Sequence, residues 1–280
     1  MNRTVIIIPV HNRCATTLAG LRHLRVNGDL TAFPVLVIDD GSTDGTAAAV
    51  RREFPEVELL SGDGQLWWTG AMRCGMQSAF GRGAASIVWL NDDCLPDPGA
   101  LAALAARALR DGATLAGPAC RTETGTPVPT GFIGRQTIAA EPGEEKNVDG
   151  LSGYCVAVPR AAWERLGPPD GEKFPHYFGD SAYTLAAKRA GFTVVLTGGA
   201  GVRLPSYAPM PASPADGRIP GRSWRENWRH VFVSKKSPFR LATQWHYLRL
   251  KYGAGTGTLL AAGRTLVWIL RFFLGRHHPV

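Results

Sequence analysis

Short apolar runs alternate with helical stretches along the first 200 residues of the chain. Most runs of four or five apolar residues are bounded by turn residues, as buried strands are, and are followed by apolar residues at helical spacing. This pattern predicts strands at 5–9, 34–38, 57–60, 86–90, 155–158 and 193–196, and helices at 14–26, 43–54, 70–82, 99–111, 161–166 and 181–190. Strands that alternate with helices predict an α/β fold, a doubly wound, mostly parallel sheet with helices on both faces.

The last quarter of the chain has a different pattern. Residues 205–220 contain five prolines, which predicts a linker or a lid. A basic region that contains tryptophan follows at 224–253, and an apolar stretch follows at 259–274. We therefore expect three parts: a domain at 1–204, a proline-rich linker or lid at 205–223, and a basic, amphipathic, helical C-terminal extension at 224–280.

Three acidic clusters lie at predicted strand ends or loop mouths: Asp39-Asp40, Asn91-Asp92-Asp93 and Asp180. In doubly wound sheets, ligands bind beyond the carboxyl ends of the strands. Crowded carboxylates repel one another unless a cation or a proton donor lies among them. The alternative is local structure, with a turn at 40–42 and a helix N-cap at Asp180. The three clusters together favour a ligand site over this alternative.

Length and composition exclude two classes of protein. The chain has 280 residues, 45% hydrophobic and 19% charged, which excludes intrinsic disorder. A chain of this length builds a full core without disulfides. The five cysteines are an odd set without CxxC spacing, so a reducing compartment is expected rather than a disulfide framework or a zinc site. The apolar run at 5–8 ends at Pro9 and suits a strand rather than a signal peptide.

The net charge of +8 is concentrated at the C-terminal end. Residues 201–280 contain 13 Lys and Arg against 2 Asp and Glu, whereas the first 200 residues contain 18 against 21. A basic tail on a nearly neutral body predicts contact with an anionic surface. No recognised nucleic-acid motif accompanies the basic residues, so a membrane surface or an acidic acceptor is the expected partner rather than nucleic acid.

The apolar stretch at 259–274 is shorter than the roughly 20 residues that a membrane span needs, and two arginines interrupt it. Arg264 and Arg271 share a helical face with Trp268. The apolar residues on the other side are Leu259, Leu266, Ile269, Leu270 and Phe273. This arrangement predicts a helix that lies in a membrane interface or packs on the domain.

Four segments resemble a known family. They are VIIIPVHNR at 5–13, VIDDGSTDGT at 37–46, WLNDD at 89–93 and FGDSAY at 178–183. In this order and at these spacings they resemble the inverting family 2 glycosyltransferases of GT-A fold, over residues 3–200. The resemblance implies a GT-A fold, a nucleotide-diphosphate-sugar donor and a divalent metal.

The resemblance also implies which residues form the site. In the family, the first loop and the DDGS aspartates hold the nucleoside, a loop at 62–70 borders the donor, and the DXD-type motif binds ribose and metal. The residues assigned to nucleotide-sugar binding are Pro9, His11, Arg13, Asp39, Asp40, Gly64, Trp68, Gly70, Asn91 and Asp92. The metal, Mg²⁺ or Mn²⁺, is assigned to Asp93 because such ions prefer oxygen ligands. A helix that starts near Gly70 is expected to direct backbone amides toward phosphate.

Asp180 matches the family's general base, which deprotonates the acceptor hydroxyl as it attacks the anomeric carbon. The aromatic segment at 174–178 is expected to desolvate this carboxyl group and to raise its pKa. Gly179 and Ala182 occupy positions that are often acidic in relatives, so Asp180 is the one carboxylate of its segment.

Other positions depart from the family or keep two interpretations. Arg203 lies near the place of a metal-binding histidine, so either another group completes the metal shell or Arg203 neutralises the diphosphate directly. Trp67 and Trp68 are expected to divide between the sugar pocket and the core, because adjacent strand residues face opposite ways. Cys155 is expected to pack rather than to react.

These observations predict an inverting glycosyltransferase with Asp180 as general base and a metal at Asp93. The resemblance suggests a rhamnosyltransferase-like role in cell-surface polysaccharide assembly, with a lipid-linked glycan or a polysaccharide as acceptor. The expected location is the cytoplasm or the inner face of the cell membrane. A nucleotidyltransferase and a non-catalytic nucleotide-sugar-binding protein are the alternatives. A Rossmann dehydrogenase is disfavoured because no GxGxxG follows the first strand.

Overall fold

The computed structural model describes residues 4–275. Its strands are β1 Thr4–Val10, β2 Val35–Asp39, β3 Glu58–Ser61, β4 Ser86–Leu90, β5 Leu95–Pro96, β6 Thr114–Thr122, β7 Pro127–Val128, β8 Gly131–Ile133, β9 Gln136–Ile138, β10 Glu145–Asn147, β11 Gly150–Leu151, β12 Cys155–Pro159 and β13 Thr193–Leu204. Its helices are α1 Cys14–Val26, α2 Asp29–Ala32, α3 Thr46–Glu53, α4 Trp67–Gly81, α5 Ala100–Asp111, α6 Arg160–Leu166, α7 Gly179–Arg189, α8 Trp224–Trp228, the π-helical turn η1 Arg229–Val233, α9 Leu241–Tyr252 and α10 Ala254–Leu274.

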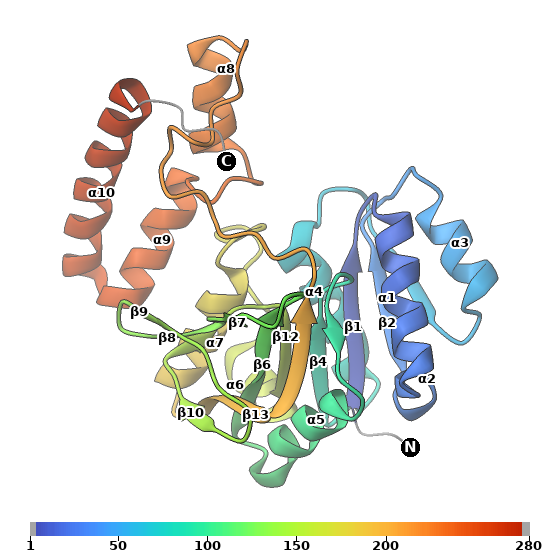
Figure 1. Cartoon of the computed structure of the whole chain (residues 1–280). Helices are drawn as coiled ribbons and strands as arrows, with labels where there is room; N and C mark the ends of the chain where they lie inside the picture. The colour runs from blue at the N-terminus through green and yellow to red at the C-terminus, as the bar shows by residue number, and fades with distance from the viewer. Residues whose placement is uncertain (1–3, 276–280) are drawn as a thin grey trace.

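One large sheet organises the chain (Figure 1). Its strand order is β10-β13-β6-β12-β4-β1-β2-β3, with β5 added beside β13 and β7 beside β6. Strands β3, β2, β1 and β4 are parallel, β12 runs antiparallel between β4 and β6, and β6 and β13 are again parallel. The predicted α/β class and mostly parallel sheet are confirmed. A smaller sheet of β11, β8 and β9 was not expected from the sequence.

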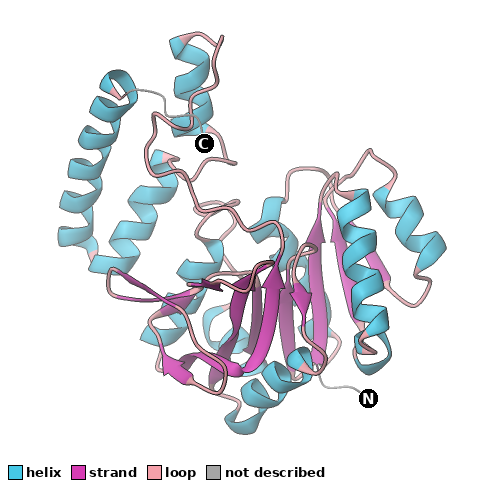
Figure 2. Ribbon diagram, viewed as in Figure 1, coloured by secondary structure: helices cyan, strands magenta, loops and turns pink. Residues whose placement is uncertain are grey.

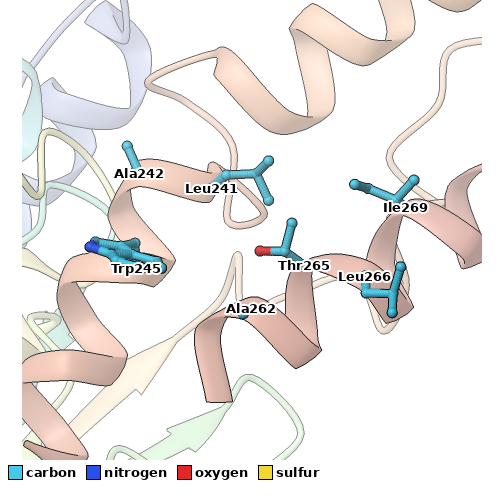
Figure 3. Close-up of a pocket in the computed structure, with 7 residues that line it drawn as sticks. All are labelled: Leu241, Ala242, Trp245, Ala262, Thr265, Leu266 and Ile269. Carbon is cyan, nitrogen blue, oxygen red and sulfur yellow. The ribbon is translucent and has the colours of Figure 1, made fainter. Parts of the chain in front are cut away.

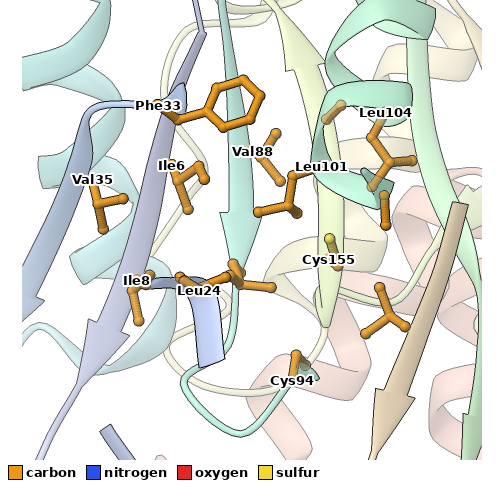
Figure 4. Packing of buried hydrophobic residues seen from close by; sticks show 14 of the residues in the cluster. Ile6, Ile8, Leu24, Phe33, Val35, Val88, Cys94, Leu101, Leu104 and Cys155 are labelled. Atoms are coloured by element: carbon orange, nitrogen blue, oxygen red, sulfur yellow. The ribbon is translucent and has the colours of Figure 1, made fainter. Parts of the chain in front are cut away.

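Helices cover both faces of this sheet (Figure 2). Alternate residues of β1 divide between the two faces: Ile6 and Ile8 pack with helices α1, α3 and α5, whereas Ile7 packs with α4, α6 and α7. A strand buried on both faces reads as a continuous apolar run, which is why 5–8 has no polar residue. Figure 4 shows the first of these clusters, where Leu101 and Leu104 of α5 face the sheet.

Several element boundaries differ from the prediction. Helix α3 begins at Thr46 rather than at 43, because Asp44 bonds the amide and hydroxyl of Thr46 and the amide of Cys14. Helix α4 begins at Trp67 rather than near Gly70. Strand β13 continues to Leu204, eight residues beyond its predicted end, through an irregularity between Thr197 and Gly201. The irregularity interrupts the apolar pattern, and so hid the second half of the strand.

The C-terminal extension packs against the domain through α9. Phe178, just before α7, lies against Tyr247 of α9 with ring centroids 4.7 Å apart. The hydroxyl of Thr243 donates to the carbonyl of Lys173 at 3.1 Å. A shallow, open groove of about 530 Å³ lies between α9 and α10 (Figure 3).

Helix α10 is longer than its apolar sequence suggested. It has 21 residues and is long and apolar enough to cross a membrane by length and composition. The expectation that this segment is too short to span was therefore wrong, because Ala254 and the glycines and threonines at 255–258 extend the helix beyond the apolar stretch. The predicted faces are confirmed, because Phe272 and Trp268 pack inward while Leu259 and Leu266 are exposed.

The proline-rich segment forms no helix or strand at 205–223. It starts beside the carboxyl end of β13 with Tyr207, whose ring lies 6.5 Å from that of Tyr154. Its end is tied to α10, because Arg218 donates to the carbonyl of Phe272 at 3.1 Å. The segment thus joins the end of the sheet to the extension.

Candidate active site

The predicted residues gather where β1, β2 and β4 end. Strands β1 and β4 pair only as far as Ile7 and Trp89, whereas β1 and β2 pair on to Val10 and Asp39. Pro9 therefore lies beyond the ladder with β4, where its missing amide proton leaves no bond broken. The loops after these strands meet at this edge, as expected for ligand sites of doubly wound sheets.

The loop after β1 is held against the loop after β2. The Nδ1 atom of His11 lies 2.6 Å from the carbonyl oxygen of Asp40. A carbonyl oxygen accepts only, so Nδ1 carries a proton and donates. The side-chain oxygen of Asn12 accepts the amide of Thr43 at 2.7 Å. His11 thereby joins the loop after β1 to the loop after β2.

Asp40 organises the loop between β3 and α4 rather than standing free. Its Oδ1 accepts the amides of Gly64 at 2.8 Å and Leu66 at 3.1 Å, and its Oδ2 accepts the amide of Trp67 at 2.8 Å. The carboxylate therefore caps α4 from another segment, satisfying amides that a helix start leaves without partners. Gly64 has φ +82°, a conformation that favours glycine.

Asp39 keeps one oxygen free of bonds to the described residues. Its side chain is buried, and Oδ1 accepts the amide of Ser42 at 3.0 Å. Within residues 4–275, Oδ2 has no hydrogen-bond donor. Asp39 therefore differs from Asp40, whose two oxygens are both engaged.

The expected phosphate-binding amide at Gly70 is not available. The amide of Gly70 donates to the carbonyl of Leu66 at 3.0 Å within α4. This expectation was wrong because the helix begins three residues earlier than the sequence suggested.

Trp67 and Trp68 lie on the first turn of α4, so the argument from alternating strand residues does not apply. Trp67 lies edge-on to the ring of His176, with ring centroids 6.0 Å apart. Trp68 both packs in the core, against Trp89, and donates from Nε1 to Oδ1 of Asn91 at 2.8 Å. Trp68 thus connects the start of α4 to the acidic segment after β4.

Arg13 bridges the two aspartates of that acidic segment. Its guanidinium lies 3.2 Å from Oδ1 of Asp92 and 2.8 Å from Oδ2 of Asp93. Asp92 is buried, and its Oδ2 accepts the hydroxyl of Thr17 at 2.9 Å. Burial raises the pKa of Asp92 to about 6, against the opposing effects of Arg13 and Thr17. Asp93 is more accessible, with 24% of its side chain exposed, and is the carboxylate open to a ligand.

Sequence reasoning missed the part played by α1. A Cβ added to Gly20 would lie 2.5 Å from the backbone oxygen of Asp92, so the acidic segment packs directly on this helix. Thr17 follows Arg13 by one helical turn, and both contact Asp92. The i, i+4 spacing of two polar residues at the start of a helix that packs on the sheet with one face was the signal available.

Asp180 lies in the first turn of α7. The helix begins at Gly179, so the alternative assignment of Asp180 as N-cap is wrong. Its Oδ2 accepts the amide of Gly153 at 2.5 Å and its Oδ1 accepts the amide of Ser181 at 2.6 Å. Burial raises the pKa of Asp180 above its ordinary value, although these bonds oppose the effect. The direction of this pKa shift agrees with the expectation.

The three acidic segments are connected through short contacts. A Cβ added to Gly153 would lie 2.6 Å from the ring of Trp68 and 2.8 Å from Cβ of Asp180. Trp68 in turn donates a hydrogen bond to the side chain of Asn91. The backbone amide of Asn91 donates to the carbonyl of Tyr154 at 2.9 Å. A small hollow of about 130 Å³ lies beside this point, lined by Asp93, Leu204, Ser206, Ala208 and the two tyrosines Tyr154 and Tyr207.

Among the site residues, the acidic segment after β4 supplies the carboxylate oxygen atoms that a metal ion could bind. Within residues 4–275, no group of three His, Cys, Asp or Glu side chains is arranged to hold an ion. Arg203 pairs with Glu123 at 3.2 Å. One accessible carboxylate, Asp93, fits an ion that takes its other ligands from water and from substrate phosphates, as Mg²⁺ does in nucleotide sites.

Cys155 packs as expected. Its side chain is buried in the apolar cluster on the α1, α3 and α5 face of the sheet. Burial raises the pKa of this thiol well above its ordinary value. A thiol in this environment stays protonated and is a poor nucleophile.

The comparison with known protein families matches the part of the chain that contains these loops. A family model described as glycosyl transferase family 2 matches residues 5–165, more than half of the chain. The chain belongs to glycosyl transferase family 2. The matched range includes the loops after β1, β2 and β4 but ends before Asp180. The comparison with curated proteins gives no significant match.

Solved glycosyltransferases share the fold of this family 2 chain. GalNAc-T7 with UDP, GalNAc and Mn²⁺ is similar with a TM-score of 0.61 at 12% identity, over 95% of this chain and 54% of that one. The mannosyltransferase PcManGT from Pyrobaculum calidifontis, in complex with GDP-Man and Mn²⁺, gives 0.56 at 17% identity, over 98% and 70%. Residues 1–349 of S. aureus TarS with UDP-GlcNAc give 0.57 at 14% identity, over 97% and 72%. The fold is therefore of GT-A type, and the chain spans about half the length of GalNAc-T7.

Proposed function

We propose that this chain is an inverting glycosyltransferase that moves a sugar from a nucleotide-diphosphate sugar to a hydroxyl acceptor. One observation carries the proposal. Asp180 is a half-buried carboxylate whose pKa is raised by desolvation, and only Gly153 separates it from Trp68, which bonds the acidic segment after β4. A proton acceptor and a nucleotide-binding segment thereby meet at one edge of the sheet, as single displacement requires.

The donor is proposed to lie across the ends of β1, β2 and β4. The free Oδ2 of Asp39 suits a hydroxyl or amide donor of the nucleoside, and Pro9, His11 and Arg13 border the same edge. Asp40 acts by holding the loop that carries Gly64 and Trp68. Similar solved structures contain UDP, GDP-Man or UDP-GlcNAc, which supports a nucleotide-sugar donor.

A divalent metal is proposed to bind at Asp93, with Asn91 and Asp92 facing the ribose. The metal, when bound, stabilises negative charge on the departing nucleoside diphosphate. Two similar structures contain Mn²⁺, which supports this assignment. Arg13 holds positive charge between Asp92 and Asp93, so it balances the two carboxylates where no ion is bound.

Asp180 is proposed as the general base. Each of its oxygens accepts one backbone amide, and a carboxylate oxygen has a further lone pair for the acceptor hydroxyl. The acceptor oxygen passes its proton to Asp180 as it attacks the anomeric carbon from the face opposite the diphosphate. The bond from this carbon to the diphosphate breaks at the same time, which releases the nucleoside diphosphate and inverts the configuration.

The acceptor is proposed to be a lipid-linked glycan or a polysaccharide, in a rhamnosyltransferase-like step of cell-surface polysaccharide assembly. Tyr154 and Tyr207 border the hollow next to Asp93 and supply flat apolar surfaces of the kind that sugar rings contact. The location proposed for this step is the cytoplasmic face of the membrane.

Asp180→Asn tests the proposal. Transfer from a panel of nucleotide sugars is expected to fall by about 10²–10⁴-fold, while donor binding, measured by thermal shift with and without Mn²⁺, stays close to that of the wild type. Glu164→Gln on α6, which lies outside the site, is the control. Near wild-type turnover of Asp180→Asn would contradict the base assignment. Donor binding without any transfer by the wild type would favour a binding protein, and release of pyrophosphate from a nucleoside triphosphate would favour a nucleotidyltransferase.

A further inference from the structure

The exposed apolar side chains of this protein gather in the C-terminal extension. Within residues 4–275, twelve large apolar side chains are exposed, and nine of them lie in the extension, after residue 223. Those on α10 are Leu259, Leu266, Val267, Leu270, Phe273 and Leu274. Concentrated exposed apolar surface of this kind marks a contact with another apolar phase or molecule.

Helix α10 has one packed side and one open side. On the packed side, Trp268 lies edge-on to Phe239 with ring centroids 5.0 Å apart, and Phe272 is buried against Phe232. The open side carries four apolar residues at helical spacing, here called the apolar stripe: Leu259, Leu266, Leu270 and Phe273. Between 50% and 75% of each is exposed. The stripe faces away from the rest of the chain because the other side of the helix makes its contacts.

The apolar stripe continues into the groove between α9 and α10. Leu266 belongs to both, and Leu241 and Trp245 of α9 form the opposite wall (Figure 3). The groove holds about 530 Å³ and is lined almost entirely by apolar side chains, with Thr265 as the exception. An apolar chain lying along the stripe therefore meets further apolar surface in the groove.

The part of the chain that carries this apolar surface is strongly basic. Residues 205–275 contain eleven Lys and Arg against two Asp and Glu. Within the described range 4–275, no basic residue after Arg203 forms an ion pair with a carboxylate. Arg225 lies over the ring of Trp224 at 5.3 Å, and Arg249 over that of Trp245 at 5.6 Å. Unpaired cations beside exposed tryptophans suit the boundary between water and anionic lipid headgroups.

The contacts of α10 favour a helix that lies along a bilayer over one that crosses it. Arg264, in the middle of the helix, donates to Oε1 of Gln244 at 3.1 Å and lies over the ring of Trp268. The end of the helix is held by Arg218. A spanning orientation would require this packed polar side to separate from α9 and enter hydrocarbon, at a high cost for each charged side chain.

We infer that the extension docks on the surface of an anionic lipid bilayer, with the apolar stripe at the boundary between headgroups and acyl chains and the basic residues on lipid phosphates. The extension stands on the side of the sheet to which the carboxyl ends of β1 and β4 point (Figure 1). Phe178, two residues before Asp180, packs on Tyr247 of α9. Docking would therefore turn the mouth of the site toward the bilayer. The inference does not depend on the proposed transferase activity, because vesicle binding is its readout.

Co-sedimentation of the full chain with phosphatidylcholine vesicles, with and without phosphatidylglycerol, tests this inference. We expect binding to the anionic vesicles that weakens as salt is added, and little binding to the neutral vesicles. The double variant Leu266→Glu with Leu270→Glu is expected to lower the affinity by about tenfold or more, because two side chains no longer enter the apolar layer. Lys235→Gln with Lys236→Gln, at exposed basic positions, is expected to weaken binding to anionic vesicles alone by about fivefold per charge.

The matched control is Val26→Glu with Ile133→Glu. Both residues are exposed apolar side chains outside the extension, and vesicle binding is expected to be unchanged. Circular dichroism and light scattering accompany each variant, so loss of the fold is distinguished from loss of binding. Two results overturn the inference: equal vesicle binding by wild type and stripe variant, or a dimer of the wild type that the stripe variant converts to a monomer without a change in vesicle binding. The second result would assign the stripe to contact between two copies.

Discussion

The backbone amide of Gly153 donates to Oδ2 of Asp180 at 2.5 Å. This bond fixes the carboxylate beside the ring of Trp68, because Gly153 has no side chain to separate the two. Trp68, Gly153 and Asp180 are distant in the sequence but lie in contact with one another. The geometry of the proposed base therefore depends on a glycine as much as on the acid itself.

Gly153→Ala is expected to lower transfer by about 10²-fold, because the added Cβ would lie 2.6 Å from Trp68 and 2.8 Å from Cβ of Asp180. The steady-state rate constants with a nucleotide-sugar donor measure this effect. The matched control is Gly81→Ala at the end of α4, where an added Cβ has no neighbour within 4 Å. Equal activity of the two variants would show that Gly153 does not set the position of Asp180.

Asp40→Asn is expected to destabilise the protein by about 1–3 kcal/mol, because an amide group has one acceptor oxygen where the carboxylate uses both. The amide nitrogen would face the backbone N–H of either Gly64 or Trp67. Urea unfolding measures the change, and donor affinity is expected to fall with it because the loop loosens. Asp63→Asn in the same loop, an exposed residue that bonds only the amide of Gln65, is the control. An unchanged unfolding midpoint for Asp40→Asn would contradict this account of the loop.

The pH dependence of transfer reports the proposed base. A base acts deprotonated, and burial raises the pKa of Asp180, so kcat/KM is expected to fall as the pH is lowered through a value above the ordinary aspartate pKa of about 3.9. The raised pKa of Asp180 has the opposite effect on stability: the free energy of unfolding decreases with rising pH, whereas kcat/KM increases. Since the carboxyl ionises more readily in the unfolded chain, the free energy of unfolding decreases as the pH rises from that ordinary value through the folded pKa.

Asp180→Asn separates this contribution from those of other acids. The variant is expected to lose the part of the pH-dependent unfolding that Asp180 causes, as measured by urea titrations across the acid range. Identical pH profiles for the stability of variant and wild type would mean that the folded environment does not raise the pKa of Asp180.

Chelation is expected to lower transfer by about 10²-fold or more if a metal at Asp93 stabilises the leaving diphosphate. Added Mn²⁺ is then expected to restore activity and to tighten donor binding in the wild type but not in Asp93→Asn. Thermal shift with a nucleoside diphosphate, with and without Mn²⁺, measures the binding effect, and Glu164→Gln serves as the control. A Mn²⁺ effect of equal size in Asp93→Asn would move the metal away from this carboxylate.

Much of the fold could be predicted from the sequence, and the element boundaries that were predicted wrongly have physical causes. The apolar run at 5–8 and the Ala- and Leu-rich segment at 99–111 specify a strand and a helix locally, and β1 and α5 occupy these places. The start of α4 was misplaced because its first amides are satisfied by Asp40, a residue 27 positions away from Trp67. The residues next to Trp67 contain no capping signal that would predict the start of α4 there. The far half of β13 was missed because glycines interrupt its pattern.

The class of fold, the acidic segments and the two faces of α10 follow from the sequence alone, because apolar runs, helical spacing and turn residues depend on only a few neighbouring positions. Tertiary structure decided what each acid does. Asp39 and Asp40 are adjacent in the chain, yet one keeps an open oxygen and the other holds a distant loop. The partners of a buried carboxylate come from whichever amides and hydroxyls packing brings within bonding distance, and neighbours in the sequence do not reveal them.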